Sequence, residues 1–126
     1  MCKTLGIGTD LCQISRIEKA IEKAHFFERI FTEEERSYLK GKERSRAASA
    51  AAMFAAKEAV AKAFGTGFAK GVSASEISVT HDENGAPGIR LTGGAQARLE
   101  AIGGKEVLLS LSHEGDMALA FVLIQR

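Results

Sequence analysis

The sequence predicts an α+β fold in which an antiparallel sheet packs against a long central helix. Segments with alternating apolar residues lie near both ends of the chain, whereas an alanine-rich segment of helical character lies between them. The chain has 126 residues, of which 45% are hydrophobic and 26% are charged. This length is sufficient for a buried core, so we expect a single domain spanning residues 1–126.

The N-terminal part predicts a strand followed by a helix. Residues 4–10 alternate between larger side chains and a set of two glycines and an aspartate, which is typical of a strand. Residues 14–24 carry isoleucine and alanine at helical spacing, and Ser15 is expected to cap this helix in a capping box with Glu18. Residues 26–31 are expected to form a short apolar turn.

Two further helices are expected between residues 32 and 67. Thr32 is expected to begin a helix by the same capping pattern, and this helix reaches about Leu39. Ser45 is expected to open the long alanine-rich helix, which ends at Gly65 and Gly67 because glycine readily ends a helix.

The second half of the chain predicts mainly strands. Its Asn84-Gly85 pair is the strongest local signal for a hairpin turn. In order, we expect a strand over residues 75–81, a turn over 82–85, a strand over 88–91, a small helix from 92 or 93 to 102, and strands over 107–112 and 117–124 joined by 113–116.

Composition and charge exclude several classes of protein. The net charge is only +1, so we expect no nucleic-acid partner. No apolar run is long enough to cross a bilayer, and residues 1–4 lack the layout of a signal peptide, so we expect a cytoplasmic protein without a membrane partner. Residues 1–46 contain 10 Lys and Arg against 8 Asp and Glu, a mild bias that by itself is typical of a solvated surface.

Cysteine usage does not indicate a disulfide framework or a structural zinc site. Cys2 and Cys12 are the only cysteines, and either kind of site needs more ligands at closer spacing. We therefore expect two reduced thiols near or inside the core.

Charged residues interrupt the apolar faces of the central helix. Lys57 lies on the same stripe as Met53, and Glu58 lies between Phe54 and Ala61 on another face. A helix that only packs against a core carries its charges on the opposite side, and an unpaired buried charge is costly. Glu58 is therefore expected to have a cationic partner.

Lys62 follows Glu58 by four residues and shares its face of the helix. The alternative is a surface ion pair worth a few tenths of a kcal/mol. The helix has no charged residue between Arg46 and Lys57, which favours a helix that is covered on most sides and whose few charges serve a purpose.

Asp10 shares one face of the first strand with Gly6 and Gly8. Two glycines leave room for a bulky group or for a helix to approach closely. The alternative is that Asp10 only ends the strand and caps the next turn. Taken together with Glu58, however, Asp10 offers a second hard oxygen ligand, and such a pair suits Mg²⁺ whose other ligands are waters and phosphates. A neighbouring lysine such as Lys62 suits the same phosphates.

A histidine and hydroxyl groups near the C-terminus form a weaker candidate site. Ser110 and Ser112 alternate with leucines ahead of His113, so this group could line a polar ligand site, with a simple loop histidine as the equal alternative. A serine and histidine this close on one strand cannot form a catalytic triad. His81 is expected to be a solvated residue at a strand end.

Six segments occur in an order that resembles one enzyme family. They are Gly6-Ile7-Gly8-Thr9-Asp10, Arg16-Ile17, Phe54-Ala55-Ala56-Lys57-Glu58-Ala59, Lys62-Ala63-Phe64-Gly65-Thr66-Gly67, Asn84-Gly85-Ala86-Pro87 and Ser110-Leu111-Ser112-His113. Spanning nearly the whole chain, they are similar to holo-[acyl-carrier-protein] synthases, the small class of 4'-phosphopantetheinyl transferases. The Asp10 segment combined with Lys57-Glu58-Ala59 and Lys62-Ala63 is the specific part.

The resemblance implies a reaction, a metal and an assembly. Members of the family transfer 4'-phosphopantetheine from coenzyme A to a serine of apo acyl carrier protein in fatty acid biosynthesis, a part of lipid metabolism, and release adenosine 3',5'-bisphosphate. By this resemblance, Asp10 and Glu58 hold Mg²⁺ and form the catalytic set with Lys62, which grips phosphate. The family is typically a homotrimer with its sites at subunit boundaries.

The resemblance also implies two binding surfaces. The residues that match positions of the coenzyme A pocket are Lys62, Gly65, Asn84, Gly85, Pro87, Ser112 and His113. The acidic carrier protein docks on the first helix after the Asp10 segment, which offers the basic residues Arg16, Lys19 and Lys23, with Arg29 just beyond it. Arg16 is the favoured contact, because nearby glutamates dilute the charge of the lysines.

The chain departs from the family at two positions. Many relatives carry a basic residue where Met53 stands, and many carry lysine where Ala86 stands. Both differences remove positive charge that would hold phosphates, and Arg44 or Arg46 is the expected substitute.

Two other classes of function remain as alternatives. A non-catalytic module that binds coenzyme A or a carrier protein would be expected to lack Asp10 or Glu58, and both are present. A metal-dependent phosphohydrolase would use the same carboxylates but would need to activate water and would require no carrier protein.

Overall fold

The structure is a computed structural model that describes residues 3–126. Its elements are, in order, β1 (Thr4–Gln13), α1 (Ile14–Ala20), α2 (Ala24–Ile30), α3 (Glu33–Lys40), α4 (Arg46–Ala63), the short 3₁₀ helix η1 (Ala74–Glu76), β2 (Ile77–His81), β3 (Pro87–Leu91), α5 (Gly93–Ala101), β4 (Glu106–Glu114) and β5 (Met117–Gln125).

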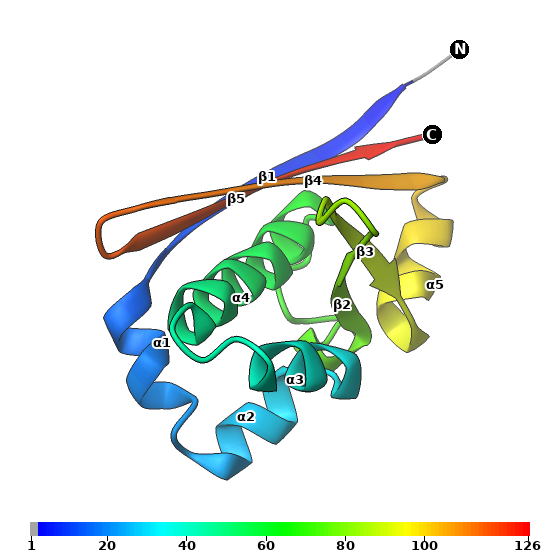
Figure 1. Ribbon diagram of the computed structural model, residues 1–126. Coiled ribbons are helices and arrows are strands. Elements are labelled where there is room, and N and C mark those ends of the chain that lie inside the picture. Colours follow the sequence, from blue (N-terminus) through cyan, green and yellow to red (C-terminus); the bar gives the residue numbers. More distant parts are fainter. Residues whose placement is uncertain (1–2) are drawn as a thin grey trace.

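Helix α4 lies at the centre of the molecule, between a sheet and the other helices (Figure 1). One face of α4 packs on a three-stranded antiparallel sheet of order β1-β5-β4. Helices α1 to α3 and a separate two-stranded sheet, β2-β3, lie on the other side of α4. The predicted α+β class with a long central helix is confirmed, and the strands form two antiparallel sheets rather than one.

Strand β1 and helix α4 touch backbone to backbone. A Cβ atom built on Gly8 would lie 1.9 Å from the carbonyl oxygen of Ala59, and one built on Gly6 would lie 2.1 Å from that of Ala63. Any side chain at these positions would therefore push the helix away. The two glycines leave room for a helix, which was one of the two possibilities that their spacing indicated.

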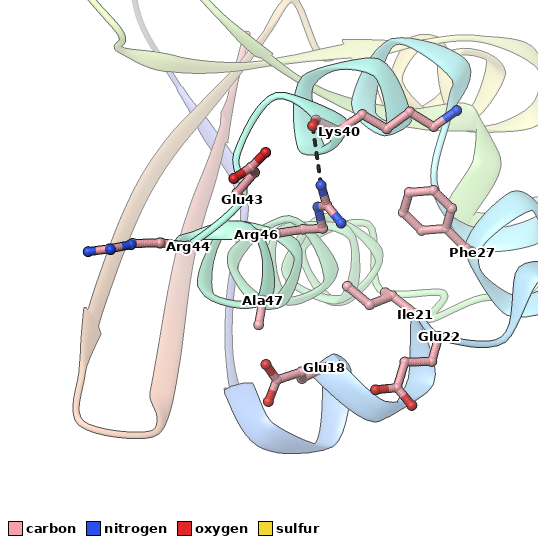
Figure 2. Close-up of a pocket in the computed structure, with 9 residues that line it drawn as sticks. All are labelled: Glu18, Ile21, Glu22, Phe27, Lys40, Glu43, Arg44, Arg46 and Ala47. Carbon is pink, nitrogen blue, oxygen red and sulfur yellow. Dashed lines mark hydrogen bonds between the residues drawn. The ribbon is translucent and has the colours of Figure 1, made fainter.

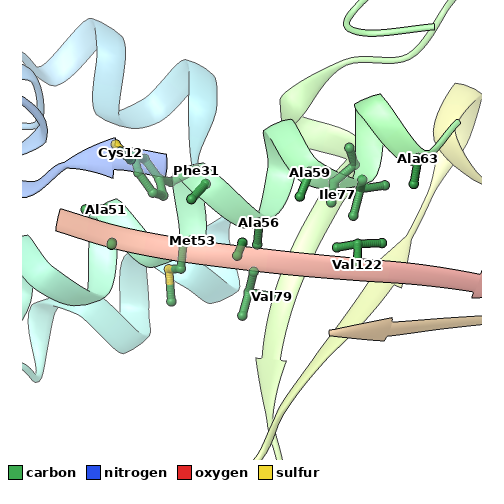
Figure 3. Close-up of a cluster of buried hydrophobic side chains, with 14 of the residues drawn as sticks. Cys12, Phe31, Ala51, Met53, Ala56, Ala59, Ala63, Ile77, Val79 and Val122 are labelled. Carbon is green, nitrogen blue, oxygen red and sulfur yellow. The ribbon is translucent and has the colours of Figure 1, made fainter. Parts of the chain in front are cut away.

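The core is formed by small residues of α4 packed against aliphatic residues of the sheet (Figure 3). Ala59 and Ala56 of α4 are fully buried, as are Val122 of β5 and Ile77 of β2. Cys12 is buried as a free thiol, as predicted, whereas Cys2 lies outside the described residues. Close packing of this kind makes the distance between α4 and the sheet sensitive to single methyl groups.

The predicted apolar turn over residues 26–31 is wrong, because this segment lies in helix α2 (Ala24–Ile30). The helix that was predicted to continue to residue 24 ends at Ala20 instead. The aromatic residues explain the second helix, since Phe27 and Phe31 lie one turn apart with ring centroids separated by 5.7 Å. Phe31 is fully buried, so α2 is anchored by tertiary packing.

Helix α1 is capped from the far end of the chain. Asp116, in the turn between β4 and β5, accepts hydrogen bonds from the backbone N–H of Ser15 at 3.0 Å and from its hydroxyl at 2.6 Å. The predicted capping box of Ser15 with Glu18 is therefore wrong, since Gln13 occupies the N-cap position and makes no side-chain cap. The second predicted box is confirmed, because Thr32 and Glu35 exchange hydrogen bonds of 3.2 and 2.9 Å.

The outer face of the three-stranded sheet exposes large apolar side chains. Ile7 and Leu11 of β1 are 62% and 61% exposed. The others on this face are Leu108 of β4 and Met117, Leu119 and Phe121 of β5. Figure 1 shows that all helices lie on the opposite side of the sheet. A contiguous apolar surface of this kind marks an interaction site.

Within residues 3–126, no helix has both the length and the apolar character needed to cross a membrane.

The close approach of β1 to α4 predicts that Gly8→Ala is strongly destabilising. The added methyl group meets a backbone carbonyl, which cannot move aside as a side chain would, so a loss of about 3 kcal/mol in the free energy of unfolding is expected. Urea denaturation measures this loss. Gly41→Ala is the matched control, because Gly41 has φ −84° and no atom other than those of its own chain neighbours within 3.5 Å of a built Cβ. Equal stability of the two variants would contradict the proposed contact.

Candidate active site

Strand β1 and helix α4 bring Asp10 and Lys62 together. The Lys62 Nζ atom lies 3.0 Å from Asp10 Oδ1 and donates a second hydrogen bond of 3.0 Å to the Thr9 carbonyl oxygen. Asp10 lies on the same face of β1 as Gly8. The close contact between Gly8 and α4 therefore also places the Asp10 carboxylate beside the helix. Asp10 therefore does not end the strand, which continues to Gln13.

Glu58 lies beside this ion pair on α4. Its pKa is raised above the ordinary value for a glutamate, first by burial and then by the negative charge of Asp10. The positive charges of Lys62 and Arg16 act in the opposite direction. The two carboxylates, which are far apart in the sequence, are thus close enough to repel each other. A cation would relieve this repulsion, and Glu58 has the cationic neighbours that its position predicted.

This pair of carboxylates fits a magnesium ion with an incomplete set of protein ligands. Asp10 and Glu58 both offer hard oxygen atoms, and their mutual repulsion favours a divalent cation between them. Among residues 3–126, no cluster of three or more histidine, cysteine, aspartate or glutamate side chains is arranged to hold a metal. Mg²⁺ commonly retains waters and binds substrate phosphates, so two protein carboxylates suffice.

Four of the five predicted coenzyme A residues in the second half of the chain line a different cavity, here named the His113 cavity. It has a volume of about 420 Å³ and is lined by Gly85, Pro87, Ser112 and His113 together with residues of α3, α4 and β2. The turn between β2 and β3 brings the first two of these residues to the end of β4, which carries the other two. Four of the seven predicted residues therefore share one hollow.

Two aromatic residues that were not among the predicted site residues also line the His113 cavity. Tyr38 and His81 stack with ring centroids 4.1 Å apart and an interplanar angle of 2°. Burial lowers the pKa of His81, and the charge of Lys42 lowers it further. His81 is the last residue of β2, so its predicted place at a strand end is confirmed, but it is not a solvated residue, since the side chain is half-buried against Tyr38. Its position depends on the packing of α3 against β2, which its local sequence does not reveal.

Asn84 and Gly65, two further predicted coenzyme A residues, lie on turns. The backbone N–H of Asn84 donates to the Asp82 side chain at 2.8 Å, which closes the hairpin turn that the sequence predicted. Gly65 follows the end of α4 with φ +77°, a conformation that favours glycine. Neither residue lines the His113 cavity.

Helix α4 separates the two groups of predicted residues within the chain. Ser49 of α4 lines the His113 cavity, whereas Glu58 lies next to Asp10. Ser49 and Glu58 are nine residues apart, which is about two and a half turns of helix, so they point to opposite sides. The carboxylates and the His113 cavity of the same chain therefore do not face each other.

Glu58 also lines a third hollow, here named the Glu58 cavity, with a volume of about 520 Å³. Aromatic side chains, among them Phe26 of α2 and Phe54 of α4, form much of its wall, and Arg29 lies at the same cavity. The carboxylate thus lies beside a hollow whose wall includes apolar residues of α2 and α4.

The predicted docking residues are divided between α1, the residue before α2, and α2 itself. Arg16 and Lys19 are on α1, whereas Lys23 precedes α2 and Arg29 is in its last turn. The expectation that Lys23 shares the first helix is wrong, because α1 ends at Ala20. Arg16 lies near enough to Glu58 to lower its pKa, so this cation stands at the edge of the acidic pair.

A further cavity between α1 and the start of α4 contains none of the predicted catalytic, coenzyme A or docking residues (Figure 2). It holds Arg44 and Arg46, the expected substitutes for the missing basic residues. Arg46 donates hydrogen bonds to the carbonyl oxygens of Leu39 at 2.9 Å and Lys40 at 3.2 Å, so its guanidinium caps the end of α3. The three acidic residues of this cavity offset its three basic ones.

Sequence reasoning missed a buried ion pair next to the site. Lys57 and Glu35 are both fully buried, and Lys57 Nζ lies 2.6 Å from Glu35 Oε1. Lys57 therefore cannot contact a phosphate, although it is adjacent to Glu58 in the sequence. The available signal was a lysine on an apolar stripe of the helix, which indicates a buried partner even though it does not identify one.

Comparison with known proteins identifies the family. A family model described as the 4'-phosphopantetheinyl transferase superfamily matches residues 6–122, which is most of the chain. The chain belongs to the 4'-phosphopantetheinyl transferase superfamily.

Named relatives of this superfamily agree with the resemblance seen in the sequence. The holo-[acyl-carrier-protein] synthase of Gluconobacter oxydans is 48% identical over 96% of this chain and 82% of its own length. The crystal structure of the synthase from Neisseria meningitidis superposes with a TM-score of 0.89 at 36% identity, covering 98% of this chain and 100% of that one. A synthase from Bacillus anthracis in complex with CoA (3',5'-ADP) superposes with a TM-score of 0.81 at 39% identity, covering 97% and 96%.

The charge coupling at the transferase carboxylates predicts how Glu58 titrates without metal. Asp10→Asn removes the negative charge that raises the pKa of Glu58, so that pKa is expected to fall. Lys62→Met removes a positive charge and is expected to raise it. NMR titration of the Glu58 side-chain carbon measures both shifts in metal-free buffer. A Glu58 pKa that responds to neither change would show that the three groups do not interact.

Proposed function

We propose that this protein is a Mg²⁺-dependent holo-[acyl-carrier-protein] synthase. It transfers 4'-phosphopantetheine from coenzyme A to a serine of apo acyl carrier protein and releases adenosine 3',5'-bisphosphate. The observation that carries the proposal is the convergence of Asp10, Glu58 and Lys62 in a chain of this family. Transfer to a carrier protein also agrees with the relatives named above, which are holo-[acyl-carrier-protein] synthases.

Asp10 and Glu58 would hold the metal ion. When bound, Mg²⁺ neutralises charge on the phosphate under attack and on the leaving bisphosphate. In the reaction the serine oxygen would form a bond to the β-phosphorus of coenzyme A, the bond from that phosphorus to the bisphosphate would break with the electron pair leaving on the bisphosphate oxygen, and the serine proton would pass to water. The carboxylates orient the phosphates for this in-line displacement, and they supply no atom to the product.

Lys62 would bind phosphate with an ammonium group that Asp10 holds in place. Its side chain is 54% exposed, whereas that of Asp10 is 17% exposed, so the lysine can turn towards a ligand. A lysine acts on phosphate as a mobile point charge. Gly65, at the end of the same helix, is proposed to let phosphate approach the backbone closely.

The nucleotide part of coenzyme A is proposed to bind at the His113 cavity with Asn84 beside it. The hydroxyl of Ser112, the His113 ring and the turn at Gly85 and Pro87 form its walls. Among residues 3–126, no lysine or arginine lines this cavity, and Met53 is part of its wall. Polar groups and shape, rather than arginine charge, would therefore hold the nucleotide in this chain.

A homotrimer would unite the two halves of the site. In one protomer, α4 separates Glu58 from the His113 cavity, so a ligand that touches both groups needs a second subunit. The exposed apolar face of the three-stranded sheet, which includes Ile7, Leu11 and Phe121, is suited to bury against neighbouring copies. Both features support a composite site at the boundary between subunits.

The acyl carrier protein is proposed to dock over α1 and α2. Arg16 lies close to the acidic pair, and Arg29 lines the Glu58 cavity, so an acidic partner held by these cations would reach the carboxylates. Lys19 and Lys23 would add to the positive field.

The proposed pathway is fatty acid biosynthesis, and the proposed compartment is the cytoplasm. The chain is proposed to form one domain over residues 1–126.

The transfer proposal predicts a covalent change in the carrier protein. Incubation of apo carrier protein, coenzyme A, Mg²⁺ and this protein is expected to add one phosphopantetheine group, seen as a mass increase by intact-protein mass spectrometry. Asp10→Asn and Glu58→Gln each remove one negative ligand at nearly constant shape, so each is expected to lower kcat/KM by roughly 100-fold or more.

The controls for this experiment separate the competing functions. Glu43→Gln removes the same charge at an exposed position away from the carboxylates and is expected to transfer normally. Binding of coenzyme A without any adduct would favour the non-catalytic binding module. Release of nucleotide in the absence of carrier protein would favour the phosphohydrolase. Unchanged transfer by Asp10→Asn or Glu58→Gln at limiting Mg²⁺ would refute the assignment of the metal ligands.

The docking proposal predicts a selective effect of Arg16. Arg16→Ala is expected to raise the KM for carrier protein about tenfold, since one charge contact to a partner is commonly worth about 1.4 kcal/mol, and to leave the KM for coenzyme A unchanged. Steady-state kinetics with each substrate varied in turn measures both constants. Lys105→Ala, an exposed cation ahead of β4, is the control. Equal changes in the two KM values would argue against docking at Arg16.

A further inference from the structure

The buried ion pair between Lys57 and Glu35 is completely satisfied. Lys57 Nζ donates to Glu35 Oε1 at 2.6 Å, to the carbonyl oxygen of Ala74 at 3.0 Å and to that of Ile77. Glu35 Oε1 also accepts from the Thr32 N–H, and Oε2 accepts from the Val79 N–H at 2.8 Å. All three ammonium protons and both carboxylate oxygens are thus used.

These hydrogen bonds join elements on three sides of the pair. Lys57 belongs to α4, Glu35 to α3, and the two carbonyl groups to the segment Ala74–Ile77, which runs from η1 into β2. Each acceptor has a fixed position in a backbone or in a capped helix turn. The ammonium group therefore fixes the rotation of α4 relative to this segment.

The Glu58 cavity lies next to the hydrogen bond that joins Lys57 to Ala74. Glu58 follows Lys57 directly, and Ala74, which accepts from Lys57, lines the same cavity as Glu58, together with Ser73 and Ser75. The hydrogen bond from Lys57 to Ala74 therefore ties the helix turn that carries Glu58 to the segment that lines the same cavity. Neither charged side chain is exposed, so neither can touch a substrate.

Packing alone does not account for the pair. A buried ion pair loses the hydration of two charges, and apolar residues of similar size at such sites are often equally stable or more stable. An ammonium group with three fixed acceptors adds direction, which an aliphatic side chain does not. The benefit is expected in geometry rather than in stability.

The geometry points to Lys57 and Glu35 as positioning residues that hold Glu58 at the correct rotation and distance for the metal and the phosphates. This inference rests on the proposed function of Asp10 and Glu58. Lys57 acts through its neighbour in the helix and is not itself a catalytic residue.

The test is the double variant Glu35→Leu/Lys57→Met, which replaces both charges with apolar side chains of similar size. It is expected to fold with a melting temperature at least equal to that of the wild type. Its kcat is expected to fall at least tenfold, the Mg²⁺ concentration for half-maximal rate is expected to rise at least fivefold, and the KM for carrier protein is expected to stay unchanged. Binding of Mn²⁺ in the absence of substrates, followed by electron paramagnetic resonance, is expected to weaken in parallel.

Controls separate this inference from the proposed function. Leu39→Met changes a fully buried residue one turn after Glu35 in the same helix and is expected to leave kcat and Mn²⁺ binding unchanged. Wild-type protein that transfers no phosphopantetheine would overturn the proposed function. Active wild type together with a double variant of normal kcat and normal Mn²⁺ binding would overturn only the positioning role.

A second variant covers the case in which the double variant does not fold. Glu35→Gln keeps the shape of the side chain but replaces one acceptor by a donor, so it is expected to have a lower melting temperature. Measured well below that temperature, it is expected to show the same rise in the Mg²⁺ requirement. A folded Glu35→Gln protein with wild-type Mg²⁺ dependence and Mn²⁺ affinity would overturn the inference.

Discussion

The backbone contact between β1 and α4 is the constraint on which the rest of the structure depends. Gly6 and Gly8 let the strand lie against the carbonyl groups of α4, at a distance that would not admit a single Cβ atom. The helix therefore presents alanines to the sheet, and Asp10, two residues further along the same face, reaches the side of the helix that carries Glu58 and Lys62.

Electrostatics divides the charged residues of α4 into two roles. Lys57 points into the interior, where Glu35 and two backbone carbonyl groups satisfy it. Glu58 and Lys62 point towards Asp10 at the edge of the sheet, where solvent and ligands have access. The interior pair needs nothing from outside, whereas the two carboxylates at the edge repel each other. A site of this kind would suit a cation that needs few protein ligands, as proposed for Mg²⁺.

The arrangement of cavities and surfaces indicates how one short chain would bind both coenzyme A and an acyl carrier protein. Helix α4 has the carboxylates on one side and the His113 cavity on the other, and the sheet above it leaves an apolar face uncovered. In the proposed homotrimer, this apolar face is proposed to be the contact between copies, with the carboxylates of one copy and the His113 cavity of the next forming one site. The carrier protein would then approach from α1 and α2, where Arg16 and Arg29 stand near Glu58.

The sequence by itself determined the α+β class, the central helix, the Thr32 capping box and the Asn84-Gly85 hairpin, because each depends on residues that are neighbours in the chain. Its motifs also indicated the family, which the comparisons confirm. Only the tertiary structure decided the contacts between distant segments. Asp116 caps α1 from 101 residues away, Glu35 neutralises Lys57, and the aromatic packing of Phe31 stabilises a helix where a turn was expected. These contacts form because α4 packs against the sheet and the other helices. The secondary-structure propensity of a short segment carries no information about that packing.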